Sequence, residues 1–247
     1  MIFHLKATFS TAKRILQQLS HDHRTLGLIF VVPCLLMGLL SWLYVDNAQQ
    51  FKAIAPPLIA IFPMIIMFLI TSIATLRERT TGTLERILTM PIAKSDLIFG
   101  YAIAFGLLAT IQAVIVSTIS LNWLGVDISG PDWMLILIAV IDALLGVSLG
   151  LLASAFARTE FQAVQFMPAI ILPQLLLCGL LVQLDKMPDL LESIARFLPM
   201  TYAVQAMQNI TTEPTTSDET WQSIAIVIVW IIVAITLGSL TLRRRSK

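Results

Sequence analysis

The stretch RERTTGTLERILTMPIAKSD, residues 77–96, carries seven charged side chains in a chain that is otherwise strongly apolar. It lies between two apolar runs, residues 54–76 and 97–120, and each run has the length of about 20 residues that a helix needs to cross a bilayer. Because charged side chains are costly inside hydrocarbon, the chain is expected to leave the membrane at residue 77 and to return after residue 96. The stretch therefore predicts two membrane-spanning helices joined by a polar loop.

The composition of the whole chain extends this prediction. Of its 247 residues, 57% are hydrophobic and only 13% are charged, whereas a soluble domain has about 25% charged residues. Six apolar segments are long enough to span a membrane as helices; they lie at residues 26–45, 54–76, 97–120, 133–157, 164–183 and 221–242. The predicted fold class is an all-α membrane protein with six transmembrane helices in a single transmembrane domain, residues 1–247.

Basic residues are distributed unevenly between the two sides of such a bundle. Thirteen of the 16 lysines and arginines fall in residues 1–25, 77–96 and 243–247 or at Arg158, on the side that would hold both termini. The other side would carry only Lys52, Lys186 and Arg196. Because cytoplasmic loops retain an excess of Lys and Arg, both termini are expected in the cytoplasm. The expected location is a bacterial-type cytoplasmic (inner) membrane.

Two segments outside the spans have the pattern of helices that lie along a membrane surface. In residues 1–25 the residues that share one helical face are Leu5, Phe9, Ala12, Leu16 and Leu19. A solvated basic tail is the alternative. In residues 184–220, on the outer side, the shared apolar face is Leu190, Leu191, Ile194, Phe197 and Leu198, bordered by Pro188 and Pro199. This second segment predicts two short helices in the outer leaflet, before the last span and its basic tail at 221–247.

Within the opening stretch a short helix is predicted after Gly82. Thr83 is suited to cap such a helix, and Pro91 would end it. The apolar residues that share one of its faces are Leu84, Ile87 and Leu88. A short helix with an apolar ridge suits insertion into a groove on a soluble partner. The alternative is a solvated loop that its arginines hold in the cytoplasm.

Asp142 is the one carboxylate well inside a predicted span. Exposing it to lipid would cost about 2.5–3.5 kcal/mol, so it is expected to face protein or water. Four-residue steps along the helix lead from it to Gly146, Gly150 and Ser154, a stripe of small residues that lets helices approach closely. These four residues predict part of the transport pathway or a helix interface. Alternatively, the Asp142 side chain reaches the headgroups at the outer end of the span.

Other residues inside the spans bear on helix packing. Prolines such as Pro33 leave backbone carbonyls without a helical partner, which neighbouring helices must supply. Four glutamines offer hydrogen bonds either between helices or to a substrate, and they are Gln112, Gln165, Gln174 and Gln183.

Two motifs resemble a known family. LRERTTGTLERILTMPIAKSDLIFGY, residues 76–101, is similar to the cytoplasmic coupling region of type-2 ABC transporter permeases, and MPDLLESIARFLPMTYAVQAM, residues 187–207, is similar to their outer segment. The chain most resembles the drug-exporter permeases associated with daunorubicin resistance. The resemblance implies an ABC exporter permease of an amphipathic drug, lipid or related substrate. It makes residues 1–25 an elbow helix, 26–183 spans one to five with the coupling loop at 77–96, and 184–220 the outer segment.

The resemblance also implies the partners. The ATPase-coupling residues would be Gly82, Thr83, Leu84, Glu85, Arg86, Ile87 and Leu88. They would contact separate ABC ATPase subunits that hold ATP and Mg, and the permease would pair with a second copy of itself or a related permease. Membrane lipid and a small amphipathic substrate complete the expected partners; nucleic acid is not among them.

No chemistry is expected from this chain itself. It lacks the G-x-x-x-x-G-K-[ST] phosphate loop. The adjacent His21, Asp22 and His23 are too close in sequence to converge on one metal ion. No catalytic, cofactor or metal site is therefore predicted. Two alternatives to an exporter subunit remain at this point: an ion-gradient-driven secondary transporter or channel, and a membrane scaffold.

Overall fold

The computed structural model describes residues 5–80 and 94–241, and within these ranges all regular structure is helical. The elements are α1 (Leu5–Ser20), α2 (His23–Leu43), α3 (Ala48–Thr80), α5 (Lys94–Asn122), α6 (Asp132–Phe156), α7 (Glu160–Leu177), η1 (Leu184–Lys186), α8 (Asp189–Phe197), α9 (Pro199–Thr212) and α10 (Asp218–Thr241). Six of them, α2, α3, α5, α6, α7 and α10, are long and apolar enough to cross a membrane. The predicted all-α membrane fold with six spans is confirmed.

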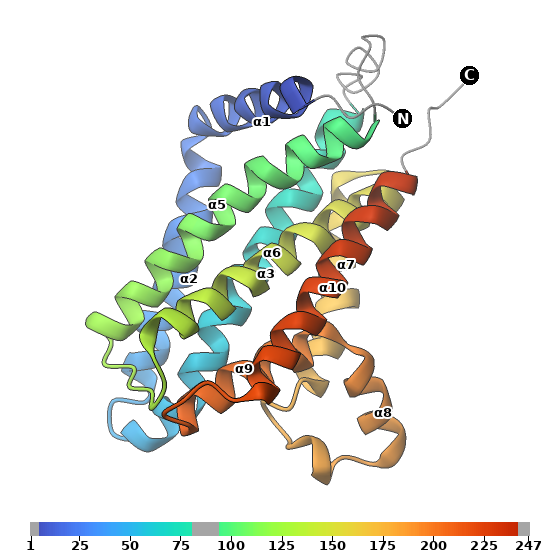
Figure 1. Ribbon diagram of the computed structural model, residues 1–247. Coiled ribbons are helices and arrows are strands. Elements are labelled where there is room, and N and C mark those ends of the chain that lie inside the picture. The colour runs from blue at the N-terminus through green and yellow to red at the C-terminus, as the bar shows by residue number, and fades with distance from the viewer. Residues whose placement is uncertain (1–4, 81–93, 242–247) are drawn as a thin grey trace.

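The helices are arranged so that the two ends of the bundle differ (Figure 1). α1 lies across one end, where α3 and α10 finish and α5 begins. α8 and α9 lie at the opposite end. We call these the α1 end and the α8 end.

α3 and α6 form the centre of the bundle. The most apolar 18-residue part of each is 61% buried, compared with 17% for α2 and α7. Small residues on α6 allow the close approach: a methyl group added at Gly150 would lie 2.6 Å from the carbonyl oxygen of Phe68 on α3, and one at Gly146 would collide with the carbonyl of Met64. The two most buried helices are therefore held backbone to backbone.

The second and fifth spans differ in length from their predictions. α3 extends to Ala48 and Thr80, well beyond the predicted 54–76, and polar residues at both ends pair with other parts of the chain; at the α8 end, for example, Lys52 Nζ lies 2.6 Å from Asp127. α7 ends at Leu177 rather than at residue 183. Gly179 follows with a φ of 89°, a left-handed conformation that glycine adopts readily and that does not continue an α-helix.

α1 is a helix, but its buried side differs from the predicted apolar face. Leu5 and Phe9, which belong to that face, are 62% and 60% exposed. The buried residues are instead Thr8, Thr11, Ala12, Ile15 and Leu19. The reason is Gly100 on α5, where a methyl group would lie 2.7 Å from Thr11 Cβ. α1 therefore turns its threonines to the protein and leaves two large apolar side chains exposed.

The outer segment contains the two predicted short helices. Pro188 precedes α8, and Pro199 is the first residue of α9. Tyr202 of α9 donates its hydroxyl proton to the Arg196 carbonyl at 2.6 Å, and the Phe197 ring meets Trp230 of α10 edge to face at 5.1 Å between centroids. These contacts attach α8 to α9 and α10.

Candidate functional site

The last turn of α3 carries three successive charged residues, Arg77, Glu78 and Arg79, at the α1 end of the bundle. They stand directly before residues 81–93, which lie outside the described part of the chain. The predicted coupling residues 82–88 all fall in that interval. The structure thus describes the helix end that directly precedes the predicted coupling residues.

Arg77 joins α3 to α7. Its Nε and Nη2 donate to the two carboxylate oxygens of Glu160 at 2.9 and 3.1 Å. Glu160 is the first residue of α7 and follows the N-cap Thr159, whose hydroxyl accepts from the Gln162 N–H. A carboxylate at a helix N-terminus is stabilised by the helix dipole. This bidentate ion pair therefore links the end of α3 to the beginning of α7.

Glu78 joins α3 to α1 and α5. Arg14 of α1 donates to its two carboxylate oxygens at 3.1 and 2.7 Å, and Tyr101 of α5 donates its hydroxyl proton to Oε2. Glu78 is only 7% exposed. A buried carboxylate needs such compensation, because removing one partner of a buried pair leaves a charge that water cannot reach.

Arg79 joins α3 to α6. It donates to the backbone carbonyls of Ser154 and Ala155. The last carbonyls of a helix have no partner within it, and α6 ends at Phe156. A guanidinium at a helix C-terminus satisfies these oxygens and is favoured by the helix dipole. Arg79 therefore caps α6 from outside.

We call Arg77, Glu78 and Arg79 the α3 cluster. Together these three residues contact α1, α5, α6 and α7. The sequence pattern predicts a polar loop at these residues and does not indicate this role. One signal was present: successive residues on a helix are about 100° apart, so three in a row point in different directions. Their partners are between 23 and 83 residues away in sequence, so no local pattern names them.

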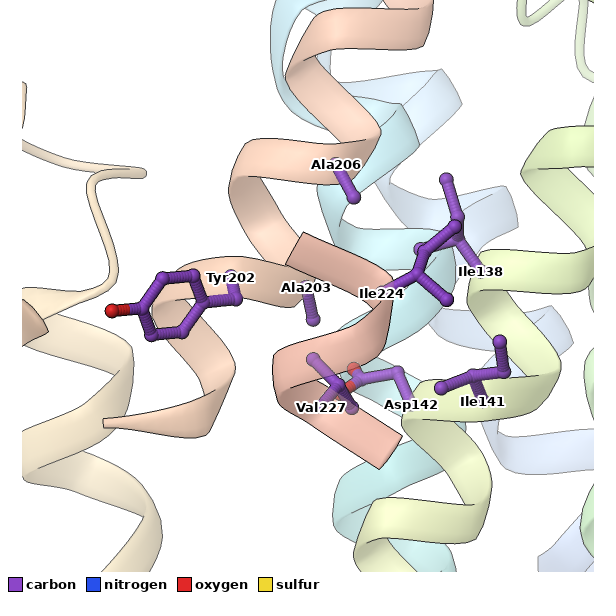
Figure 2. A pocket seen from close by; sticks show the side chains of 8 residues that line it. All are labelled: Ile138, Ile141, Asp142, Tyr202, Ala203, Ala206, Ile224 and Val227. Atoms are coloured by element: carbon purple, nitrogen blue, oxygen red, sulfur yellow. The ribbon is translucent and has the colours of Figure 1, made fainter. Parts of the chain in front are cut away.

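Asp142 lies at the junction of α6, α9 and α10, away from the α3 cluster. Figure 2 shows its carboxyl group directed toward Val227 of α10, while the Tyr202 ring points away from the space between them. Asp142 is fully buried, and neither of its oxygens has a hydrogen-bond partner among the described residues. The space beside it has no room for a water molecule.

The small-residue stripe that begins at Asp142 meets α3 at its last three members, whereas Asp142 itself lies beside α9 and α10. Gly146 and Gly150 lie against α3. Ser154 bonds through its hydroxyl to the Leu151 carbonyl, while its own carbonyl accepts from Arg79. A step of four residues advances about 40° beyond a full turn, so the stripe winds around α6. Gly146, Gly150 and Ser154 therefore lie at the interface of α6 with α3, and Asp142 faces other helices.

Comparison with known proteins gives relatives of one kind. The chain is 27% identical over 203 residues to the ABC transporter G family member 20 of Dictyostelium discoideum, covering 81% of this chain and 28% of that protein. It is 28% identical over 158 residues to the probable multidrug ABC transporter permease YbhS of Escherichia coli K12, covering 64% and 42%. It is also 28% identical over 136 residues to the linearmycin resistance permease protein LnrN of Bacillus subtilis, covering 55% and 35%.

The matched part of these relatives is between about a quarter and a half of their own length. A family model described as ABC-2 type transporter matches residues 6–211, which include the α3 cluster, Asp142 and most of the outer segment. The family predicted from the motifs at 76–101 and 187–207 is thereby confirmed. The chain belongs to the ABC-2 type transporter family.

Proposed function

We propose that this chain is the transmembrane permease subunit of an ABC exporter, in which separate ATPase subunits supply the energy of ATP hydrolysis. Family membership supports the permease role. The names of two relatives, a probable multidrug permease and a linearmycin resistance permease, support an amphipathic drug, lipid or related molecule as cargo. The chain would work as a pair, with a second copy or with a related permease.

The proposed orientation places the α1 end in the cytoplasm of a bacterial-type inner membrane. The described basic residues at that end are Lys6, Lys13, Arg14, Arg24, Arg77, Arg79, Lys94 and Arg158. Those toward the α8 end are Lys52, Lys186 and Arg196. Because cytoplasmic loops retain an excess of Lys and Arg, this distribution favours the orientation with the α1 end in the cytoplasm. Residues 82–88 would then face cytoplasmic ATPase subunits.

The single observation that carries the proposal is the α3 cluster. A displacement of the coupling segment would act on the end of α3, which directly precedes it, and the cluster connects that end to α1, α5, α6 and α7. Helices that are packed together and joined by ion pairs move together. A displacement at the end of one helix is therefore transmitted to much of the bundle. The cluster would thus convert ATPase closure into a rearrangement of spans.

The first test is to purify the tagged chain from its host in mild detergent and to assay the complex for vanadate-sensitive ATP hydrolysis and for export. We expect an ATPase to co-purify. Replacing Leu84, Ile87 and Leu88 with aspartate should release it. A solitary chain without hydrolysis, under conditions that preserve a control ABC complex, would contradict the proposal and would favour ion-driven flux.

The second test separates coupling from docking. Glu78→Gln retains the size of the side chain but removes the charge that holds Arg14. We expect the ATPase to stay bound while export per ATP hydrolysed falls at least severalfold. The matched control is Glu192→Gln, which breaks the exposed Arg196–Glu192 pair on α8 and should change neither quantity. Normal coupling in the Glu78→Gln complex would exclude the α3 cluster from transmission.

A further inference from the structure

A cavity of about 230 Å³ lies between α1, α2, α3 and α5 and is lined in part by Arg77 and Glu78 of the α3 cluster. Its polar lining residues are Gln18, Asp22, Thr25, Arg77, Glu78 and Tyr101. Its apolar lining residues are Ile15, Leu19, Leu28, Leu69, Ile70, Ile73, Ala74 and Phe105. Pockets for drug-sized ligands are about 300–1,000 Å³, so this cavity holds only part of such a molecule, for example one alkyl chain.

The residues that line the cavity are polar near the α1 end and apolar farther from it. The lining residues of α2, α3 and α5 all show this change. On α3, Glu78 lies at the α1 end and Leu69 lies nine residues, or about 13 Å, deeper. On α5, Tyr101 lies one turn nearer the α1 end than Phe105. α2 begins at the α1 end, with Thr25 in its first turn. The cavity thus has the polarity profile of one membrane leaflet, from headgroup to hydrocarbon.

Arg77, Glu78 and Asp22 line the cavity at the α1 end, and the carboxylate of Asp22 can select the headgroup. Asp22 is the N-cap of α2 and accepts hydrogen bonds from the Thr25 hydroxyl at 2.7 Å and the Thr25 N–H at 3.1 Å. These bonds hold the pKa of the Asp22 carboxyl below its usual range, so it is ionised at neutral pH. An ionised carboxylate accepts about four hydrogen bonds, which leaves capacity for a cation with N–H donors.

We propose that this cavity binds one phospholipid from the leaflet that contains α1, with an acyl chain along α3 and a primary ammonium headgroup beside Asp22. The bound lipid fills the gap beneath α1 and supports its position against α3 and α5. It is a resident of the fold and not the exported cargo. Its binding needs no ATPase, so the proposal stands or fails separately from the proposed function.

The test is native mass spectrometry of the purified, delipidated full chain, titrated with phosphatidylethanolamine, phosphatidylcholine and phosphatidylglycerol that carry identical acyl chains. We expect one saturable phosphatidylethanolamine per chain. It should bind about three- to fivefold more tightly than the other two, the range for a partly exposed ion pair. Phosphatidylcholine has the positive charge without N–H donors, and phosphatidylglycerol lacks the charge. Unsaturable binding, or equal binding of all three lipids, would overturn the proposal.

Two variants locate the site. Asp22→Asn retains the helix cap, since asparagine caps as well as aspartate, and should abolish the preference for phosphatidylethanolamine. Ala74→Leu adds bulk inside the cavity and should remove the saturable adduct, whereas Ala225→Leu on the exposed face of α10 should retain it. A saturable adduct that survives Ala74→Leu would place the lipid elsewhere and overturn the proposal.

If Ala74→Leu fails to fold, labelling with a photoreactive phosphatidylethanolamine still tests where the lipid binds. With the reactive group in its acyl chain and the wild-type chain as target, the label should appear in residues 15–28, 69–78 and 101–105. Label confined to other segments would overturn the assignment.

Discussion

At the scale of single residues, Gln112 replaces a backbone hydrogen bond that Pro33 removes. Pro33 lies inside α2 and has no N–H, so the carbonyl of Ile29, four residues earlier, loses its helical partner. Gln112 of α5 donates its Nε2 proton to that carbonyl at 2.7 Å, and both Gln112 and Ile29 are fully buried. Of the two uses predicted for Gln112, a bond between helices is confirmed. Gln174, by contrast, bonds within its own helix, to the Ile170 carbonyl.

We predict that Gln112→Leu lowers the free energy of unfolding by about 1–2 kcal/mol, because a buried carbonyl is left unsatisfied. Denaturant titration in detergent micelles measures this. In a Pro33→Ala background the restored N–H supplies the missing donor, so the same substitution should cost clearly less. An equal cost in both backgrounds would show that the bond to Ile29 is not what Gln112 contributes.

At the scale of elements, the contact between α3 and α6 depends on glycine. Apolar burial does not draw helices together inside lipid as it does in water, so close backbone packing has to stabilise the pair. Gly146 and Gly150 permit that packing on α3, as described above. Gly38 on α2 provides the contrast, because a methyl group there would meet nothing within 4 Å.

We predict that Gly146→Ala lowers the free energy of unfolding by about 1–3 kcal/mol, because the added methyl group forces α6 away from Met64. Gly38→Ala introduces the same atom into open space and should be neutral or slightly stabilising, since alanine favours helix. Thermal unfolding of both variants in one detergent makes the comparison. If Gly146→Ala unfolds no earlier than Gly38→Ala, close packing of α3 and α6 is not what stabilises the centre of the bundle.

At the scale of the whole molecule, Asp142 occupies the point where α6 meets the helices of the α8 end. A buried carboxyl group without a partner reduces stability by about 1–3 kcal/mol. Such a cost is typical of residues that serve function, since stability and activity are often traded against each other. We propose that α9 and α10 separate from α6 during transport and that Asp142 then lines the pathway.

We therefore predict that Asp142→Val raises the free energy of unfolding by about 1–3 kcal/mol while export falls at least tenfold. The conservative Ile141→Val, at the neighbouring position beside the same space, should leave export near the wild-type rate. Denaturant titration and an export assay on the same preparations give both quantities. Unchanged export in Asp142→Val would remove Asp142 from the pathway.

The sequence by itself determined the six membrane spans and the family. Both follow from local information: a span needs only a run of apolar residues, and the motifs at 76–101 and 187–207 are contiguous. The ends of two spans differ from their predictions: α3 continues into polar residues that pair with other parts of the chain, and α7 ends just before Gly179. The coupling residues 82–88 remain a prediction from sequence, outside the described part of the chain.

Only the tertiary structure decided which side chains meet. Arg14 and Glu78 are 64 residues apart, and Gln112 and Ile29 are 83 apart. The buried side of α1 was also decided this way, since Gly100 on another helix selects Thr11 over Leu5 and Phe9. Hydropathy reports how much a residue avoids water, and it is the same for a side chain that faces lipid and one that faces protein. The physical reason is therefore that partner choice depends on shape and charge across helices, which no local pattern encodes.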